Sequence, residues 1–409
     1  MLQRAHDMNE DPSKAAADHP STSRTLVRTK LASPSALGLL ELCPLAYLMQ
    51  TEGLPRKTIG QHPAALLGTA VHAVTSSMIA TGIPTPQDVI DSVKNEFLKM
   101  AGDPARSGTL AHWILQRYGI EGFVTRRQLV ERSAYVIGLV SRLPHIATGR
   151  RANSVFDGRV PTGSERWLES KKLGAAGKVD LILRTHQGGI RIVDFKTGKI
   201  YEENGQIKRA YILQMAVYAR IVEDLEPATD LELELIGKTE TWSSPFNQEL
   251  RAMAEAVIAS LRLKLPLGRE VHDEQTAILG EHCTRCSSRP SCRGYGTELS
   301  RQTLANQVTW TGGSLDVSGQ VTDIFLEAGL ATLRFEDARG DRARIVGIPE
   351  VIAEEASLGV GREFHAYSLG TLEANRDGSF PRNFFVVDTA LPGRSAFQAT
   401  FTATESALT

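Results

Sequence analysis

One stretch constrains what this chain can fold into more than any other. It spans residues 177–199 and reads GKVDLILRTHQGGIRIVDFKTGK. Two short runs rich in β-branched residues flank a Gly-Gly pair, and this pattern predicts a β-hairpin. Asp180 lies on the first strand and Asp194 on the second. Because alternate residues of a strand share a face, Asp194 and Lys196 lie on the same side. The hairpin therefore carries an acid on each strand, with a lysine beside the second acid.

The charged residues of this hairpin have two interpretations. Buried carboxylates are costly unless they are paired or bound to a metal. Asp180 and Asp194 supply hard oxygen ligands of the kind that Mg²⁺ and Mn²⁺ prefer. Lys196 beside such a metal can orient a water and stabilise developing negative charge. The alternative is an edge hairpin whose charged face is solvated.

Composition sets the class of protein. With 409 residues, of which 42% are hydrophobic and 23% charged, the chain resembles ordinary globular proteins of two or three domains. The formal net charge is −1, so a nucleic-acid partner has to be met by a local basic patch. No apolar run approaches the roughly 18 residues of a membrane span, and the N-terminus lacks a signal-peptide core. We therefore expect a cytoplasmic protein with no membrane partner.

Changes in composition divide the chain into four segments. Residues 1–28 are polar and alanine-rich, which predicts a disordered tail. Residues 29–300 hold the central hairpin and are assigned to one domain. Residues 301–394 hold short strand-like runs and form a second domain. Residues 395–409 are rich in Ser, Thr and Ala, which predicts a flexible tail.

The strand-like runs of the second domain follow an informative order. Five runs occur, with a helix-like stretch at 349–358 after the third, and this is the order of an OB-like small β-barrel. Six aromatic residues either fill its core or form a platform for stacking nucleobases. They are Phe325, Phe335, Phe364, Tyr367, Phe384 and Phe385.

Helical periodicity predicts much of the chain around the hairpin. The first helix is expected over 33–50, with Ser33 as its cap and Pro34 at its first position. Further helices are expected over 68–79, 84–150, 205–225 and 245–265, and a strand over 231–238.

Three polar residues on these helices are candidates for a functional site. His72 lies on the helix over 68–79, where a lone histidine is otherwise a satisfied core residue. Gln214 and Tyr218 are four residues apart, so they share a face of the helix over 205–225. Their alternative role is to form the polar edge of a packed helix.

Basic residues concentrate between residues 117 and 172, where eleven Lys and Arg stand against five Asp and Glu. This bias forms either a solvated helix face or a phosphate-binding track. The prominent pairs are Arg126 with Arg127, Arg150 with Arg151, and Lys171 with Lys172.

The chain has only four cysteines, Cys43, Cys283, Cys286 and Cys292. So few cysteines in a chain without a signal peptide favour a metal site over a disulfide scaffold. Four thiolates can hold Zn²⁺ or an iron–sulfur cubane. A structural zinc site more often uses two short pairs, whereas this layout is one cysteine plus a C-x₂-C-x₅-C run.

Four short motifs, taken together, resemble one family. GTAVH ends at His72, GKVD ends at Asp180, DFK begins at Asp194, and QMAVY runs from Gln214 to Tyr218. Their order and spacing resemble the GxxxH, GxxD, DxK and QxxxY motifs of PD-(D/E)XK nucleases of the RecB/AddB type, which include related nucleases of CRISPR adaptation. The cysteine layout resembles the iron–sulfur subgroup of that family. The resemblance covers residues 33–295.

The resemblance implies an α/β fold with a restriction-endonuclease-like core, in which helices flank a mixed sheet. It implies that His72, Asp180, Asp194 and the carbonyl of Phe195 bind one or two Mg²⁺ or Mn²⁺ ions. The family often has an acid before the hairpin, and Glu165 is the nearest match, with Glu169 as a rival.

The resemblance also implies roles for the remaining motif residues. Lys196 serves the attacking water, and Gln214 with Tyr218 orients the DNA strand and the catalytic residues. A [4Fe–4S] cluster on the four cysteines, with Zn²⁺ as the alternative, would join the first helix to the end of the core. The expected function is hydrolysis of single-stranded DNA or frayed ends, in DNA repair or recombination or in defence against phages and other mobile elements.

Other functions remain open at this point. The chain has no GxxxxGK[ST] phosphate loop, so we expect a separate helicase or repair protein as partner. The fold could also serve a non-catalytic module that binds DNA ends, or a redox-responsive regulator. Retention of both acids and the lysine argues against the first of these alternatives.

Overall fold

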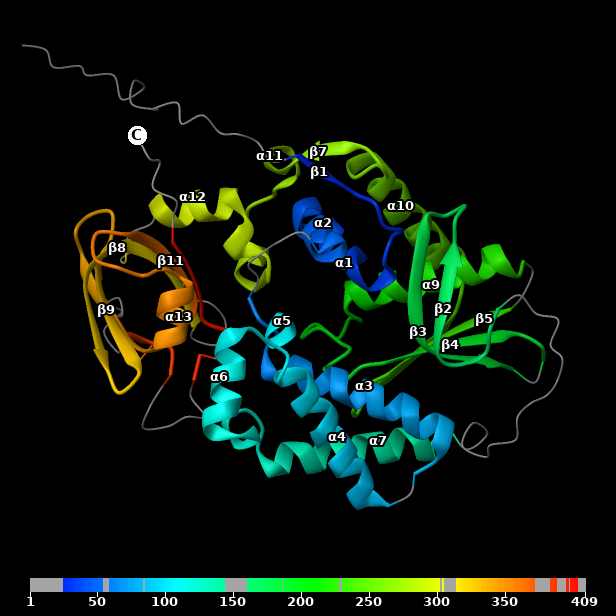
Figure 1. The fold of residues 1–409 in the computed structure, drawn as a ribbon. Helices are drawn as coiled ribbons and strands as arrows, with labels where there is room; N and C mark the ends of the chain where they lie inside the picture. Colours follow the sequence, from blue (N-terminus) through cyan, green and yellow to red (C-terminus); the bar gives the residue numbers. More distant parts are fainter. Residues whose placement is uncertain are drawn as a thin grey trace, which may run out of the picture.

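A computed structural model shows an α/β part and a C-terminal β part (Figure 1). It describes residues 25–53, 59–83, 85–143, 160–185, 187–227, 230–301, 304, 314–371, 383–387, 395–396 and 398–403. The part of the predicted tail over 1–24 and the pair Arg150 with Arg151 lie outside these ranges.

A five-stranded mixed sheet forms the centre of the α/β part. In spatial order its strands are β2 (Gly163–Ser170), β3 (Ala175–Arg184), β4 (Ile190–Phe195), β5 (Leu231–Ile236) and β6 (Thr241–Pro245). β4 and β5 are parallel, and all other neighbours are antiparallel. β3 and β4 form the predicted hairpin, and Gly188 adopts φ 85° in its turn.

Helices cover both faces of this sheet. They are α9 (Arg209–Leu225) and α10 (Gln248–Lys264) on one face, and α3 (Pro63–Thr81), α4 (Pro86–Ala101) and α7 (Arg126–Ser141) on the other. Ile182 and Ile192 are buried under α9, whereas Leu181 and Val193 are buried against the α3 layer. Alternation along the hairpin thus gives each helical layer its own apolar surface. In Figure 1, α3, α4 and α7 lie together beneath the sheet.

The predicted first helix is broken in two, which corrects that expectation. The segment consists of η1 (Pro34–Ala36), α1 (Leu37–Leu42) and α2 (Pro44–Glu52). Cys43 between the two helices is extended, with φ −157° and ψ 110°. The ring of Pro44 disfavours helical geometry at the residue before it, which explains the break. Ser33 precedes η1 without a side-chain capping hydrogen bond.

Two other predicted boundaries are corrected in this part. The predicted tail over 1–28 ends too late, because Thr25–Val27 forms β1 and pairs with β7 (Glu270–His272). The helix predicted from Gly205 begins at Arg209, because Tyr201 and Ile207 form a bridge that holds the preceding turn. Both corrections come from pairing between segments that local periodicity does not detect.

Short elements connect the larger ones. They are α5 (Pro104–Ser107), α6 (Thr109–Tyr118), η2 (Ile120–Gly122), α11 (Asp273–Thr276), η3 (Glu281–Arg285), η4 (Arg289–Ser291) and α12 (Arg293–Arg301). The helical region predicted over 84–150 is thus several helices, and residues 144–150 lie outside the described ranges. α7 begins with a capping box between Thr125 and Gln128, a strong helix start.

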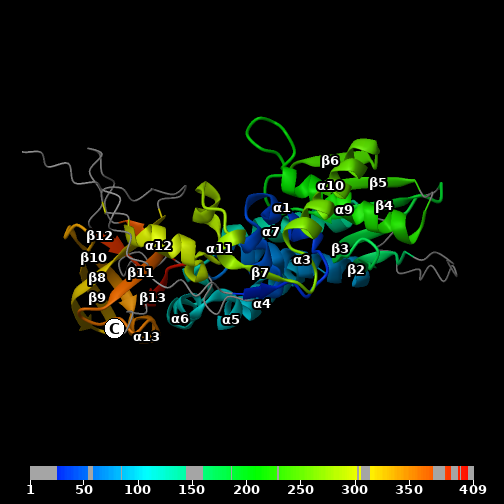
Figure 2. The same ribbon diagram turned by 90° about the horizontal axis from the view of Figure 1, so that it is seen from above.

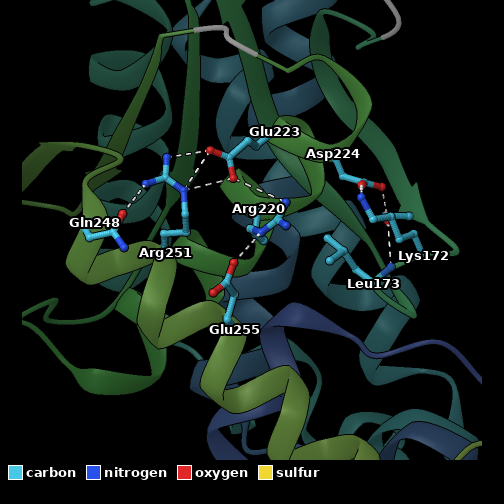
Figure 3. A network of polar contacts seen from close by, with 9 residues as sticks. Lys172, Leu173, Arg220, Glu223, Asp224, Gln248, Arg251 and Glu255 are labelled. Atoms are coloured by element: carbon cyan, nitrogen blue, oxygen red, sulfur yellow. Dashed lines mark hydrogen bonds and ion pairs between the residues drawn. The ribbon is translucent and has the colours of Figure 1, made fainter.

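Ion pairs join α9 to α10 and to the β2–β3 turn. Arg251 of α10 binds Glu223 of α9 at 2.6 Å, and Arg220 contacts Glu223 and Glu255, each at 3.4 Å (Figure 3). Lys172 of the predicted basic region pairs with Asp224. Arg127 of that region pairs with Glu131 one turn along its helix. Lys172 and Arg127 are thus solvated side chains paired with acids of the protein, which favours a solvated surface over a phosphate-binding track at these two residues.

The C-terminal β part is a closed ring of strands. Its elements are β8 (Ser314–Glu327), β9 (Leu330–Glu336), β10 (Arg342–Pro349), α13 (Glu350–Glu355), β11 (Glu363–Thr371), β12 (Asn383–Phe385) and β13 (Thr400–Ala403). β8 pairs with β9, β9 with β10, β10 in parallel with β12, β12 with β11, and β11 with β8. β13 pairs with β11, so the tail predicted over 395–409 contains a strand. Figure 2 shows this part at the opposite end of the molecule from the five-stranded sheet.

Three of the six aromatic candidates fill the core of the ring. Phe335, Phe364 and Phe384 are fully buried, and the ring of Phe335 contacts the rings of the other two. Tyr367 and Phe385 are also buried. Of the six candidates only Phe325 is exposed, and the guanidinium of Arg334 lies over its ring. Phe335, Phe364 and Phe384 therefore belong to the core of the ring, whereas Tyr367 packs with Cys283 and Tyr295 beside the cysteine run.

A buried ion pair joins the two parts of the molecule. Arg289, which lies between Cys286 and Cys292, binds Asp316 of β8 through two nitrogens, at 2.6 and 3.1 Å. Arg289 also donates to Ser368 of β11, and Tyr295 of α12 donates to Asp316 at 2.8 Å. Both charged side chains are almost fully buried. Separating the two parts would therefore break a buried ion pair, which is costly.

Among the residues that the structure describes, one helix is long and apolar enough to cross a membrane, contrary to the expectation from sequence. It is α3, with 19 residues, and 56% of its most apolar window is buried inside the protein. Leu66, Ala70, Val71 and Val74 of this helix belong to the core formed with α4 and α7. A helix that is mostly buried against its neighbours in this way is typical of a globular core.

Candidate active site

The register of the hairpin places its two acids opposite each other. Backbone pairing between β3 and β4 ends at Leu181 with Val193, so the next pair in register is Asp180 with Asp194. Here the N–H of Phe195 donates to Oδ2 of Asp180 at 2.8 Å. β4 continues along β5, and the N–H of Lys196 donates to the carbonyl of Ile236. The backbone ladder therefore ends at the acids, and the carboxylate of Asp180 replaces it as the hydrogen-bond partner of Phe195.

Asp194 is a buried acid with polar partners. Its Oδ1 accepts a hydrogen bond from Nε2 of Gln214 at 2.8 Å, and its Oδ2 lies 2.6 Å from Nζ of Lys196. Burial, followed by the nearby charge of Asp180, raises the pKa of Asp194 to about 6, and Lys196 and His72 oppose this shift. A cation beside this carboxylate would favour its ionised form.

Gln214 bridges the second acid and the lysine. Its Oε1 accepts a hydrogen bond from Nζ of Lys196 at 2.9 Å, while its Nε2 donates to Asp194. The ring of Tyr211 lies 4.5 Å from the same Nζ, close enough for a cation–π contact. Gln214 is therefore more than the polar edge of a packed helix.

Tyr218 contacts the hairpin from α9. It is almost fully buried, and its hydroxyl donates to the carbonyl of Lys178 at 2.8 Å. A Cβ at Gly177 would lie 3.1 Å from this ring and 2.8 Å from Pro34, which explains the glycine of the GKVD motif. Tyr218 thus positions the strand that bears Asp180.

His72 faces the acids from α3. Its Nδ1 lies 3.3 Å from Oδ2 of Asp180, and its side chain is 28% exposed. This is not the environment of a satisfied core histidine. Gly68, one turn earlier, permits the approach of the helix, because a Cβ there would lie 2.7 Å from Oγ1 of Thr197. The GxxxH spacing thus combines a contact glycine and a histidine on one helix face.

Glu165 joins the site, and Glu169 does not. Ser164 pairs with Leu181 and Arg166 with Val179, so Glu165 is level with Asp180. Glu165 has φ 53°, an unusual conformation for a residue other than glycine. Its carboxylate accepts from Ser76 of α3 at 3.2 Å and pairs with Lys178. Glu169 instead accepts a hydrogen bond from Nε1 of Trp167 at 3.5 Å.

Two residues that sequence reasoning missed hold the loop after β4. The hydroxyl of Tyr135 on α7 donates to the carbonyls of Lys196 and Ile236, at 3.2 and 3.0 Å. Arg132, one turn before it, donates to the carbonyl of Thr197 at 2.6 Å. No motif marks these residues, because their role depends only on where α7 packs.

The donor set at the acids suits a divalent cation. Asp180, Asp194, His72 and Glu165 supply carboxylate oxygens and an imidazole nitrogen, which Mg²⁺ and Mn²⁺ accept. Among the described residues, Oδ2 of Asp194 is buried and accepts no hydrogen bond of good geometry, although it is ion-paired with Lys196. Within the same ranges, no three His, Cys, Asp or Glu side chains already form a metal-binding group.

The four cysteines line one small cavity, although they are far apart in sequence. The cavity has a volume of about 20 Å³, and Met49, Ile278 and Leu279 also line it. All four are free thiols, and the N–H of Ile278 donates to Sγ of Cys43 at 3.5 Å. Their sulfurs do not form a preassembled metal-binding group among the described residues. The donor set itself suits a metal that prefers thiolates.

Burial makes the three thiols of the C-x₂-C-x₅-C run hard to ionise without a cation. It raises the pKa of Cys283 and Cys286, and raises that of Cys292 to about 11, and the negative charges of neighbouring cysteines add to each shift. Thiolates bind metals, so a metal or cluster here would displace protons as it binds.

Comparison with known proteins identifies the α/β part. The family model of the PD-(D/E)XK nuclease superfamily matches residues 31–293. A protein from Eubacterium rectale that is provisionally named an exonuclease has 13% identity and a TM-score of 0.34, covering 61% of this chain and 90% of its own. The protein SSO0001 has 11% identity and a TM-score of 0.24, covering 64% of this chain and 95% of its own. No curated protein sequence matches the chain.

Proposed function

The chain belongs to the PD-(D/E)XK nuclease superfamily, and from this premise we propose that it is a Mg²⁺- or Mn²⁺-dependent deoxyribonuclease of the RecB/AddB type. The observation that carries the proposal is the convergence of Asp180, Asp194 and Lys196 at the point where the backbone pairing of β3 with β4 ends. We propose single-stranded DNA or frayed ends as the substrate, hydrolysed at phosphodiester bonds.

We propose a role for each of the site residues. Asp180, Asp194 and His72, with the carbonyl of Phe195, would hold the cation. The cation would activate water near neutral pH and offset charge on the phosphate oxygens. Lys196, held by Asp194 and Gln214, places its ammonium group where negative charge grows during hydrolysis.

We propose that the four cysteines hold a [4Fe–4S] cluster, with Zn²⁺ as the alternative. Support comes from four sulfurs at one cavity, one of them from a segment 240 residues before Cys283 in the chain. A metal that joins such distant segments constrains the unfolded chain and stabilises the folded one. Because both metals fit the donor set, visible absorption and metal analysis of anaerobically purified protein distinguish them.

Cys43→Ala tests this structural role. We expect the variant to lower the melting temperature of the metal-loaded protein, because it removes the ligand that joins α2 to the cysteine run. Thermal unfolding by circular dichroism measures the change, and metal-depleted wild-type protein is the reference. An unchanged melting temperature would show that the cysteine site does not join these segments.

We propose that the C-terminal ring is an OB-like barrel that binds single-stranded DNA or a partner protein. Its strand pairing, with a helix between the third and fourth strands of the ring, supports this assignment. A cytoplasmic location, a separate helicase or repair protein as partner, and a role in repair or defence belong to the same proposal. A DNA-end-binding module without catalysis and a redox-responsive regulator are the alternatives.

Cleavage of end-labelled DNA tests the proposed activity. We expect anaerobically purified protein to cleave single-stranded DNA when Mg²⁺ or Mn²⁺ is present, and Lys196→Ala to lose the activity. Lys199→Ala is a matched control, because Lys199 is an exposed lysine on the same segment. Binding without metal-dependent cleavage by wild-type protein would favour the DNA-end-binding module. Activity that changes with the oxidation state of the cysteine centre would favour the regulator.

A further inference from the structure

A large aromatic side chain is exposed on the edge strand next to the acids. Trp167 of β2 is 60% exposed, although tryptophan is among the side chains with most to gain from burial. Edge strands of stable proteins usually avoid exposed apolar groups, because such groups promote association with other chains. Trp167 lies outside the four family motifs, and it is absent from the hydrophobic clusters on both faces of the described sheet.

Register places Trp167 close to the proposed catalytic acids. Trp167 pairs with Lys178 of β3, and Lys178 lies two residues before Asp180, on the same face of that strand. A side chain and its diagonal neighbour across an antiparallel pair are about 7–8 Å apart, within reach of an aromatic ring. Trp167 therefore lies about one nucleotide of extended strand from Asp180.

The neighbours of Trp167 show which face it occupies. Leu168 is buried in the core under α9, and Ser170 donates to Asp224 of α9 at 2.6 Å. Trp167 alternates with these residues, so it faces the opposite side. On that side Ser76 of α3 contacts Glu165 beside Asp180. The exposed indole therefore shares its face with the acidic site.

A lysine lies between the indole and the acids. The side chain of Lys178 pairs with Glu165. It is nevertheless 57% exposed, so it remains accessible to a phosphate. An aromatic ring beside an accessible cation is the pattern with which proteins bind single strands, because the ring stacks on a base and the cation neutralises a phosphate. Stacking of this kind requires a base whose face is free, which a paired duplex does not offer.

We propose that Trp167 stacks on the unpaired nucleobase next to the scissile phosphate, while Lys178 contacts an adjacent phosphate. Trp167 is then a strand-positioning residue that gives the site its preference for single-stranded DNA. The inference rests on the proposed nuclease function and deepens it, because it assigns the single-strand preference to two residues outside the family motifs.

Kinetics with intact and abasic oligonucleotides test the stacking. We expect Trp167→Ala to raise KM for single-stranded DNA by about tenfold, with kcat changed less than twofold, because one base–aromatic stack is lost. Trp167→Tyr keeps an aromatic ring and should restore most of the affinity. An oligonucleotide that is abasic at the stacked position should raise the KM of wild-type protein, yet leave that of Trp167→Ala unchanged.

Fluorescence provides a readout that does not need catalysis. With Ca²⁺ in place of Mg²⁺ as the probe ion, titration with single-stranded DNA should quench tryptophan emission in wild-type protein but much less in Trp167→Phe. Trp242→Phe is the matched control, because Trp242 lies on β6 at the other edge of the same sheet. Lys178→Gln should reduce the dependence of binding on salt concentration by about one phosphate contact.

The outcomes separate this inference from the proposed function. If wild-type protein cleaves DNA but Trp167→Ala keeps its KM within twofold and abasic sites have no effect, the stacking role is wrong and the nuclease stands. If wild-type protein does not cleave DNA, the nuclease proposal fails, and the fluorescence titration still decides whether Trp167 contacts a strand. Equal quenching in wild-type protein and Trp167→Phe would overturn the inference in either case.

Discussion

At the scale of single residues, the two acids of the hairpin are held in different ways. Asp194 is buried, and its oxygens contact the side chains of Gln214 and Lys196. Asp180 is more exposed, and it accepts from the backbone of Phe195. Burial and mutual repulsion make the ionised pair costly, so the arrangement favours a cation. Gln214 is central to the site. Among the described motif residues, it is the one that hydrogen-bonds to both Asp194 and Lys196.

Gln214→Met tests this bridging role. The side chain keeps its size but loses both hydrogen bonds, so Asp194 and Lys196 lose their common support. We expect kcat to fall by about 10- to 100-fold, the usual effect of losing a group that orients metal ligands. Steady-state cleavage kinetics and Mn²⁺ titration measure the change. Gln206→Met, at an exposed position before α9, is the control. Equal kcat for the two variants would contradict the bridging role.

At the scale of elements, close approach between helices and strands determines where the functional residues lie. α9 reaches β3 at Gly177, and α3 reaches the loop after β4 at Gly68. Both glycines belong to the motifs that the sequence analysis used, yet neither has a positive φ. Their function is to leave room for a neighbouring element. The motifs therefore record packing as well as chemistry.

Gly177→Ala tests the contact between α9 and β3. The new methyl group would lie 2.8 Å from Pro34 and 3.1 Å from the ring of Tyr218, so these groups must move. We expect the free energy of unfolding to fall by about 1–3 kcal/mol, as in other overpacked cores. Chemical denaturation measures it. In Gly138→Ala the added methyl group on α7 has open space around it, and that variant should be neutral or slightly more stable. Similar effects of both substitutions would refute the packing explanation.

At the scale of the whole molecule, the cysteine run connects the α/β part to the C-terminal ring. Arg289 lies within that run and is bound to Asp316 and Ser368 of the ring. The carbonyl of Cys286 accepts from the same guanidinium at 3.0 Å. Because the pair is buried, loss of either partner would leave an uncompensated charge. The position of the ring therefore depends on the conformation of the cysteine run.

Asp316→Asn tests this connection. We expect a loss of about 3–5 kcal/mol, because the buried guanidinium of Arg289 loses its counter-charge. Denaturation and limited proteolysis between the two parts detect the change. Arg342→Met removes an exposed ion pair with Glu336 and should cost no more than about 1 kcal/mol. If Asp316→Asn is no more destabilising than this control, the ion pair does not join the parts.

His365 gives the same interface a dependence on pH. Burial lowers the pKa of His365 below its ordinary value of 6.5, although Glu363 opposes the shift. The folded protein then binds fewer protons at this residue than the unfolded chain does, so its contribution to stability is lost as pH falls below about 6.5. The slope is at most about 1.4 kcal/mol per pH unit.

Comparison of wild-type protein with His365→Gln measures this contribution. His365 accepts or donates a 2.8 Å hydrogen bond with Ser300 of α12, and glutamine can replace that contact. We expect the stability of the variant to fall less steeply between pH 6.5 and 5.5 than that of wild-type protein. Parallel curves over this range would show that His365 does not titrate on unfolding.

The sequence by itself determined the local features of this protein. Alternation and a Gly-Gly turn predicted the hairpin over 177–199, and the structure confirms it. Helical periodicity located α3, α9 and α10, and motif order led to the correct superfamily. The periodicity and turn signals are readable because each depends on residues close together in the chain, and the motifs are readable because each is short and their order is fixed. The roles of the candidate site residues stay predictions, although the structure brings them together.

Tertiary structure alone decided what depends on pairing between distant segments. It placed Glu165 rather than its rival Glu169 level with Asp180, and it turned Thr400–Ala403 into a strand of the C-terminal sheet. It also exposed Trp167 on the face of the acids. No local sequence pattern marks these features, because each is determined by register and packing between elements far apart in the chain.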